Sequence, residues 1–128
     1  MTTQDDYASV RYIVDDVQAA IDFYTTHLGF TLSSNPAPAF ADVVRGPLRL
    51  LLSGPASSGA RATPEDATLA GRNRIHLIVT DLDAEIVTLR DAGLSFRGDV
   101  IGGPGGRQII LADPAGNLIE LFEPAQRP

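Results

Sequence analysis

Two side chains in this sequence could both bind a metal ion and take part in proton transfer: His76 and Glu120. A neutral imidazole and a carboxylate are good ligands for divalent ions, and a carboxylate can also act as a general base. Glu120 stands between Ile119 and Leu121 in an apolar segment, where a carboxylate needs a partner. It is therefore either a functional group or one half of an ion pair, for which Arg11 is the candidate, and the sequence leaves both explanations open.

The composition excludes several other chemistries. The 128 residues include no Cys, which excludes disulfides, thiolate nucleophiles and sulfur-ligated zinc. They include no Lys either, which excludes Schiff-base chemistry and a P-loop lysine. The glycine-rich run at 102–106 precedes no expected helix, so it indicates a hairpin loop rather than a phosphate site.

Charge and hydropathy bear on partners and location. The net charge is -6 and no basic run is present, so we expect no nucleic-acid partner. The longest apolar runs have the length of strands, and residues 1–8 lack the basic and apolar regions of a secretory signal. We therefore expect a cytoplasmic protein that does not associate with a membrane.

The segment around His76 has an earlier, degenerate copy. Shifting residues 9–29 forward by 65 positions places them on residues 74–93, with one extra residue in the first copy. The shift pairs Val10 with Ile75, Ile13 with Ile78, Asp16 with Asp81, Val17 with Leu82 and Ile21 with Ile86. At the ends of the copies, Gly46 aligns with Gly116, which sets Leu50 against Glu120. The chain is therefore a duplicated unit.

Each copy is expected to contain a strand, a helix and then three strands. The first copy has apolar or β-branched runs at 10–14, 30–32, 40–45 and 48–53, and a helical pattern that begins near 17 and ends at Gly29. The second has runs at 74–79, 94–96, 107–112 and 117–122, with 100–101 as a further strand-like pair, and a helix from about 83. Asp15 and Asp16 suit the start of the first helix.

These elements predict one α+β domain, residues 1–128, made of two tandem βαβββ units at about 9–53 and 74–123. Residues 54–73 form the linker, with a helical turn expected at 64–69. Each helix should cover one face of a curved mixed sheet. The opposite faces would then enclose a cavity, which is a natural site for a small molecule.

The motifs RIHLIVTDL and DPAGNLIEL, with a helix that ends at a glycine before an apolar residue, resemble the vicinal oxygen chelate superfamily. This family includes glyoxalase, bleomycin-resistance proteins, fosfomycin-resistance enzymes and extradiol dioxygenases. The resemblance covers residues 9–123 and implies paired βαβββ units. It also implies a homodimer, in which the two chains sometimes exchange units.

The resemblance further implies four metal-ligand positions, on the first and last strands of the two units. Here they are filled by Arg11, Leu50, His76 and Glu120. Leucine has no lone pair, and a guanidinium stays charged and cannot ligate. Two ligands are fewer than the three that open metal sites usually have. We therefore expect no resident metal, and if one binds, His76 and Glu120 would hold it.

Strand alternation selects the side chains that would line the cavity. A turn at 113–116 would place Arg107 beside Phe122 and Ile109 beside Glu120. For the aliphatic members the competing explanation is core packing, for His76 a hydrogen-bonded strand position, and for Arg107 an exposed surface. The expected ligand-binding residues are Arg11, Ile13, Phe40, Leu48, Leu50, His76, Ile78, Arg107, Ile109, Glu120 and Phe122.

The function expected from these residues is metal-free binding of an apolar or aromatic compound, such as an antibiotic, as in the bleomycin-resistance branch. The alternative is a lyase, isomerase or dioxygenase, with Glu120 catalytic. It would use a divalent metal on His76 and Glu120, or acid/base chemistry in which Arg11 or Arg107 stabilises a developing oxyanion. A third possibility is a module with a collapsed cavity that only pairs with another protein.

Overall fold

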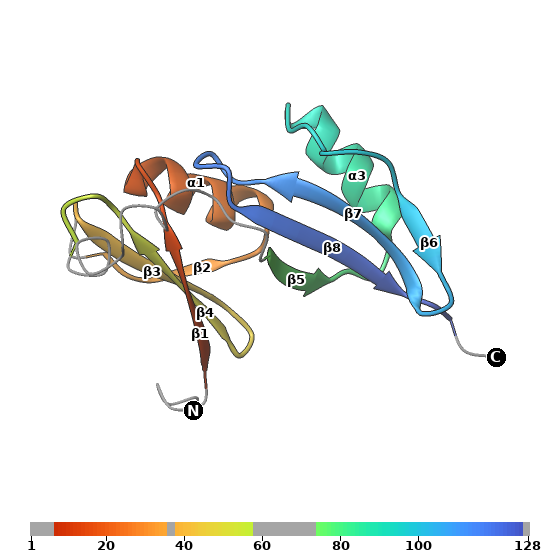
Figure 1. Ribbon diagram of the computed structural model, residues 1–128, viewed down its shortest axis with the longest axis horizontal. Helices are drawn as coiled ribbons and strands as arrows, with labels where there is room; N and C mark the ends of the chain where they lie inside the picture. Colours follow the sequence, from red (N-terminus) through yellow and green to blue (C-terminus); the bar gives the residue numbers. More distant parts are fainter. Residues whose placement is uncertain (1–6, 36–37, 58–73, 127–128) are drawn as a thin grey trace. The chain divides into compact units, whose positions relative to one another are not determined.

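The computed structural model describes residues 7–35, 38–57 and 74–126, and it contains two compact units (Figure 1). Unit 1 comprises Met1–Ala70 with Asp113–Ala115, and unit 2 comprises Gly71–Ala112 with Gly116–Pro128. Among the described residues, each unit has one helix and one four-stranded sheet with both parallel and antiparallel pairs.

Unit 1 has the order strand, helix, three strands. Its elements are β1 (Ala8–Ile13), α1 (Val17–His27), β2 (Thr31–Ser34), β3 (Phe40–Arg45) and β4 (Leu48–Ser53). The strands lie in the order β1-β4-β3-β2, with β1 parallel to β4 and the other pairs antiparallel. The hairpin of β3 and β4 has the bounds expected from the sequence, because Gly46, at φ 56°, allows a tight turn before Pro47.

Helix α1 begins and ends where the sequence predicts. The Asp16 carboxylate accepts a hydrogen bond from the Ala19 N–H at 3.0 Å, and Gly29 adopts φ 74° just after the helix. Tyr24 is fully buried on the apolar side of α1, and its hydroxyl donates to Asp113 at 2.9 Å within unit 1. Burial, together with the neighbouring carboxylate, raises the pKa of Tyr24 far above its ordinary value.

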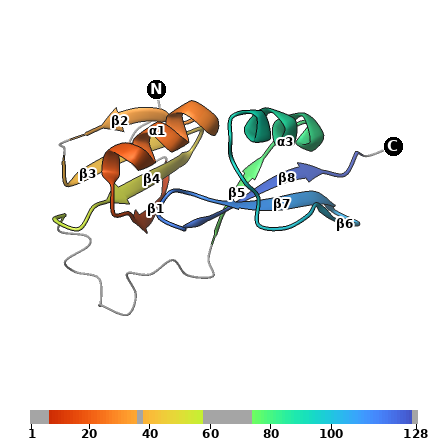
Figure 2. The same cartoon turned by 90° about the horizontal axis from the view of Figure 1, so that it is seen from above.

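Unit 2 repeats the order. Its elements are β5 (Arg74–Ile78), α3 (Leu82–Asp91), β6 (Ile101–Gly103), β7 (Gly106–Ala112) and β8 (Leu118–Pro124). The strands lie in the order β5-β8-β7-β6, again with one parallel pair, β5 with β8. Figure 2 shows α1 over the sheet of unit 1 and α3 over the sheet of unit 2.

In both sheets alternate residues form a buried layer under the helix. In unit 1 this layer consists of Val10, Tyr12, Ala41, Val43, Leu50 and Leu52. In unit 2 it consists of Ile75, Leu77, Ile109, Leu111, Ile119 and Leu121, facing the buried Leu82, Ile86 and Leu89 of α3. We call the opposite side of each sheet its open face.

The predicted α+β fold with two βαβββ units is confirmed, with changes in detail. The strand expected at 94–96 is reduced to one bridge between Phe96 and Leu111, and the strand-like pair at 100–101 overlaps β6, which is the fourth strand of unit 2. The helical turn expected at 64–69 lies outside the described residues. The cavity expected between the two sheets involves both units and stays a prediction. In the part of the chain that is described, neither helix is long and apolar enough to cross a membrane.

Candidate functional site

The open face of unit 2 carries both side chains that the sequence indicates as possible metal ligands or proton-transfer groups, His76 and Glu120. His76 on β5 stands directly opposite Glu120 on β8 in the parallel pair. Residues paired in this way point to the same side of a sheet. The open face therefore consists of Arg74, His76, Ile78, Gln108, Ile110, Ala112, Leu118, Glu120 and Phe122.

Glu120 is a buried carboxylate, with 7% of its surface exposed, and it has two partners on this face. Arg74 donates through Nε to Glu120 Oε1 at 2.8 Å, and His76 Nε2 lies 3.4 Å from Oε2. The ion-pair explanation of Glu120 is thus supported, but with Arg74 as the partner in place of the predicted Arg11. Arg74 neutralises the carboxylate and holds it in place.

An apolar surface adjoins this ion pair. The His76 and Phe122 rings lie with centroids 4.8 Å apart and planes inclined by 38°. Ile78, the next residue of β5 on this face, is 59% exposed. Flat rings beside an exposed aliphatic side chain can pack against an apolar or aromatic molecule.

The open face of unit 1 is more polar. It consists of Ser9, Arg11, Ile13, Phe40, Asp42, Val44, Arg49, Leu51 and Ser53. Arg11 Nη1 donates to Ser53 Oγ at 2.7 Å, and Arg49 Nε donates to Asp42 Oδ2 at 2.7 Å. Asp42 also accepts a hydrogen bond from the Ser34 hydroxyl of β2.

Asp42 is ionised in spite of its burial. Only 2% of its surface is exposed, and this desolvation opposes the charged form. The hydrogen bonds from Ser34 and Arg49, with the positive charge of Arg49, outweigh the desolvation and lower the pKa of Asp42 below its ordinary value. Arg49 therefore faces a carboxylate that stays charged at neutral pH.

The structure places most of the predicted site residues on the open faces. Arg11, Ile13 and Phe40 lie on that of unit 1, and His76, Ile78, Glu120 and Phe122 on that of unit 2. Their role in binding a ligand stays a prediction.

The prediction that Leu48 and Leu50 lie on the open face is wrong. Leu50 pairs with Val10 and Val43 in the layer under α1 and is fully buried, and Leu48 has the same orientation. The reason is that the turns differ by an odd number of residues: 46–47 joins β3 to β4, whereas 113–117 joins β7 to β8. Aligning Gly46 with Gly116 therefore exchanges the faces, and the open-face partner of Arg11 is Leu51.

The faces predicted for Arg107 and Ile109 are also wrong. Asn117 belongs to the turn, so Arg107 pairs with Glu123 and Ile109 with Leu121, one residue from the expected register. Ile109 is core beneath α3.

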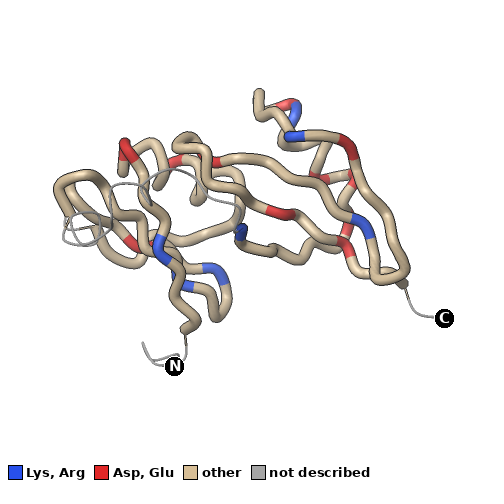
Figure 3. Tube along the Cα trace, in the orientation of Figure 1, with Lys and Arg blue, Asp and Glu red and all other residues tan. Residues whose placement is uncertain are grey.

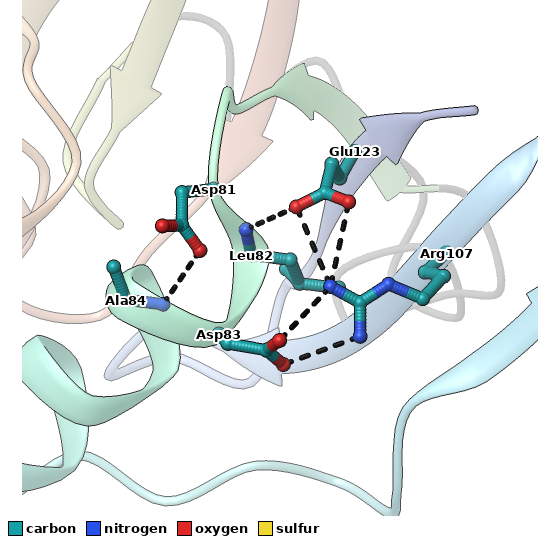
Figure 4. A network of polar contacts seen from close by, with 6 residues as sticks. All are labelled: Asp81, Leu82, Asp83, Ala84, Arg107 and Glu123. Carbon is teal, nitrogen blue, oxygen red and sulfur yellow. Dashed lines mark hydrogen bonds and ion pairs between the residues drawn. The ribbon is translucent and has the colours of Figure 1, made fainter. Parts of the chain in front are cut away.

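Figure 4 shows where Arg107 lies. Its guanidinium reaches Asp83 at 3.2 Å and Glu123 at 3.4 Å, and Glu123 accepts the Leu82 N–H at the start of α3. Asp83 and Glu123 raise the pKa of Arg107. Asp83, Arg107 and Glu123 line a groove of about 570 Å³ within unit 2, and their network ties α3 to the sheet.

The sequence analysis missed several polar residues of the open faces, namely Arg74, Asp42, Arg49 and Ser53. Strand alternation from Glu120 and Arg11 would have found Arg74, two residues before His76, and Ser53, two residues after Leu51, once the register was correct. The two-residue turn at 46–47 would have given Asp42 in the same way, because it pairs Asp42 with Leu51.

The residues at the family's metal positions do not fit a resident metal. By the observed register these positions hold Arg11, Leu51, His76 and Glu120, of which only the last two can ligate. Glu120 already pairs with Arg74 at 2.8 Å. Among the described residues no three His, Cys, Asp or Glu side chains gather in a metal-binding group. We derive no chemistry through a metal here.

Comparison with known proteins identifies the family. The model of the glyoxalase/bleomycin resistance protein/dioxygenase superfamily matches residues 6–121. The chain therefore belongs to this superfamily. A comparison with curated proteins gave no match.

Solved structures agree with this assignment. A superfamily member from Sphaerobacter thermophilus is 29% identical, with 91% of this chain and 95% of that chain covered and a TM-score of 0.70. TnmS3, an antibiotic binding protein from a Streptomyces species, is 27% identical over 93% of this chain and 95% of that chain, with a TM-score of 0.71. Lactoylglutathione lyase from Agrobacterium tumefaciens is 22% identical over 90% of both chains, with a TM-score of 0.73, and shares the fold.

Proposed function

We propose that this protein binds an apolar or aromatic small molecule, such as an antibiotic, on the open face of unit 2 and sequesters it without a metal. The observation that carries the proposal is the partly exposed His76–Phe122 ring pair beside Ile78, on a face whose buried carboxylate is already neutralised by Arg74. Similarity to the antibiotic binding protein TnmS3 supports it. The protein would act in the cytoplasm.

The neutralised carboxylate matters because it determines what the face can bind. An unpaired Glu120 would repel an apolar molecule by the cost of removing its charge from water. With Arg74 at 2.8 Å that cost is largely met inside the protein. The ring pair then offers a surface for stacking, in which aromatic contacts contribute about 0.5–1.5 kcal/mol beyond the area they bury.

Isothermal titration calorimetry with aromatic and non-aromatic antibiotics of similar mass tests the proposal. We expect the aromatic compounds to bind, and Phe122→Ala and Ile78→Ala to weaken binding by about tenfold each, which corresponds to about 1.4 kcal/mol. Val87→Ala is the matched control, because Val87 lies on α3 and is 59% exposed, as Ile78 is. Equal loss in the control and the site variants, or no preference for aromatic compounds, would refute the proposal.

The proposal includes a homodimer, which rests on the family resemblance. Sedimentation velocity at several protein concentrations measures it. A species of twice the chain mass, 13.6 kDa, supports the dimer, whereas a single monomeric species at all concentrations contradicts it without affecting the binding test.

A second candidate, acid/base catalysis, is favoured by one observation: His76 Nε2 lies 3.4 Å from a Glu120 oxygen. Such a pair could exchange a proton with a bound compound. Mass spectrometry of the compound after incubation distinguishes the two functions. Unchanged compound supports sequestration, and conversion that is lost in Glu120→Gln supports an enzyme.

A further inference from the structure

We propose that the open face of unit 1 is a binding site for an oxyanion, a carboxylate or phosphate group, held by Arg11 and Arg49. This goes beyond the proposed function, which places an apolar molecule on unit 2. The source of the anion is either a free ion or the acidic group of an aromatic compound, and the experiment below separates the two.

Arg11 is held in place by a single buried group. Its Nη1 donates to Ser53 Oγ at 2.7 Å, and Ser53 is fully buried whereas Arg11 is exposed. A guanidinium has five N–H donors in a rigid plane. In the described part of unit 1 this bond to Ser53 is the one polar contact of the Arg11 side chain, so its other N–H donors have no partner there. The hydroxyl thus orients the guanidinium and leaves it able to form two parallel hydrogen bonds.

Arg49 is oriented in a similar way. Its Nε donates to Asp42 Oδ2 at 2.7 Å, and Asp42 is almost completely buried. Asp42 is the partner found for Arg49 among the described residues of unit 1, so the two terminal nitrogens of Arg49 stay available. Its side chain is 20% exposed, enough to reach a ligand at the surface.

The two arginines lie on neighbouring strands of the same face. Arg11 pairs with Leu51, and Arg49 pairs with Ser9, two residues before Arg11 on β1. Neighbouring strands are about 4.8 Å apart and two residues rise about 6.6 Å along a strand, so the two Cα atoms lie roughly 8 Å apart, within the reach of two long side chains. Figure 3 shows basic positions on β1 and on the β3–β4 hairpin of unit 1.

The charge of this face favours an anion. Arg11 and Arg49 contribute two positive charges and Asp42 one negative charge, which leaves this face with a net charge of +1 in a chain whose net charge is -6. Neighbouring like charges repel each other, and an oxyanion between them removes this repulsion. Arginine binds carboxylate and phosphate with two parallel hydrogen bonds, which lysine cannot do.

Titration of the ¹⁵N-labelled full chain, followed by NMR, tests the site with three probes: inorganic phosphate, 2-naphthoate and the neutral 2-naphthalenemethanol. We expect an anionic probe to shift the amides of Arg11, Ser53 and Arg49. In Arg11→Gln its affinity should fall by about tenfold, as expected for loss of a charge-assisted pair. Arg97→Gln is the matched control, because Arg97 is an exposed arginine of unit 2. Ser53→Ala should weaken the same probe less, by freeing the guanidinium.

The outcomes separate the sources of the anion and the two proposals. If binding of both phosphate and 2-naphthoate depends on Arg11, the site binds free oxyanions. If only the binding of 2-naphthoate depends on Arg11, the site binds the acidic group of an aromatic compound. Binding of 2-naphthalenemethanol that is unaffected by Arg11→Gln supports the apolar site on unit 2, whether or not the anionic probes bind to unit 1. Anion binding that is absent, or is equally weakened by Arg97→Gln, overturns the oxyanion site. Arg11→Lys keeps the charge, so a similar loss in this variant identifies the paired geometry as the cause.

Discussion

At the scale of single residues, both open faces carry a buried carboxylate that an arginine neutralises: Asp42 with Arg49, and Glu120 with Arg74. Removing one partner from such a pair costs more than the pair itself contributes, because the other charge stays in a poorly hydrated place. Each pair therefore stabilises the fold by keeping its carboxylate from being an unpaired charge among apolar side chains.

Asp42 gives this argument a measurable form. Because its pKa is lowered in the folded protein, ionised Asp42 stabilises the fold above its unfolded pKa of about 3.9, and this contribution is lost as the pH falls through the lower folded pKa. We expect Asp42→Asn to lower the free energy of unfolding at pH 7 by about 1–3 kcal/mol. The difference from the unchanged protein should shrink as the pH falls below about 4.

Urea unfolding at several pH values measures this difference. Asp91→Asn serves as the control, because Asp91 is exposed at the end of α3. A difference for Asp42→Asn that stays constant from pH 7 to pH 3 would show that its charge does not stabilise the fold.

At the scale of elements, the pairing of β7 with β8 depends on one glycine of the 102–106 run. Gly106 has φ 147°, and a Cβ atom at this position would lie 2.2 Å from the Glu123 carbonyl oxygen and 2.9 Å from the Phe122 ring. The neighbouring β8 backbone cannot yield easily. The glycine-rich loop predicted from the sequence is therefore required for the close approach of two strands.

We expect Gly106→Ala to destabilise the protein by about 2 kcal/mol or more, because overpacking and an unfavourable φ act together. Thermal unfolding followed by circular dichroism measures the change. Gly105→Ala is the matched control, since a Cβ there meets no atom within 4 Å. Similar midpoints for the two variants would contradict this explanation. Displacement of Phe122 in Gly106→Ala should also weaken binding of aromatic compounds.

The elements also show how far the sequence predicts the structure. Repeats and capping residues were sufficient for the two βαβββ units, because Asp16 and Gly29 act locally. Faces were predicted correctly for β5 and β8, where His76 and Glu120 are directly paired. The predicted faces of Leu50 and Ile109 were wrong. Strand alternation has a period of two, so an error of one turn residue moves every side chain of the strand to the opposite face of the sheet. Turn length depends on tertiary contacts that the sequence pattern does not encode.

At the scale of the whole molecule, the duplication conserves the fold while the chemistry of the two units differs. On the first and last strands of each unit, one pair of open-face residues is equivalent. This pair is Arg11 and Leu51 in unit 1 but His76 and Glu120 in unit 2. Unit 1 thus presents a cationic face and unit 2 a neutral face with an aromatic surface. Neither set of residues supplies the three donors that an open metal site usually has.

This difference predicts how the chain responds to metals. We expect no stoichiometric metal in the purified protein, and no change in the thermal midpoint on addition of a chelator or of Ni, Co, Mn, Fe(II) or Zn ions. A selectively bound ion would stabilise the folded state by about 2.7 kcal/mol at a hundredfold excess over its dissociation constant. Stabilisation of that size in the unchanged protein would refute the metal-free proposal and favour the enzyme.

Two double variants test the same argument by adding metal ligands to unit 1. Arg11→His with Leu51→Glu places an imidazole and a carboxylate opposite each other on the open face of unit 1. This pair should create a weak metal-dependent stabilisation, with water as the remaining ligands, because the repulsive guanidinium is replaced by donors. Arg11→His with Leu50→Glu is the control: Leu50 is fully buried under α1, so the carboxylate there should destabilise the fold and gain no metal. Equal metal responses of the two variants would show that the register of β4 does not determine which residue reaches the open face.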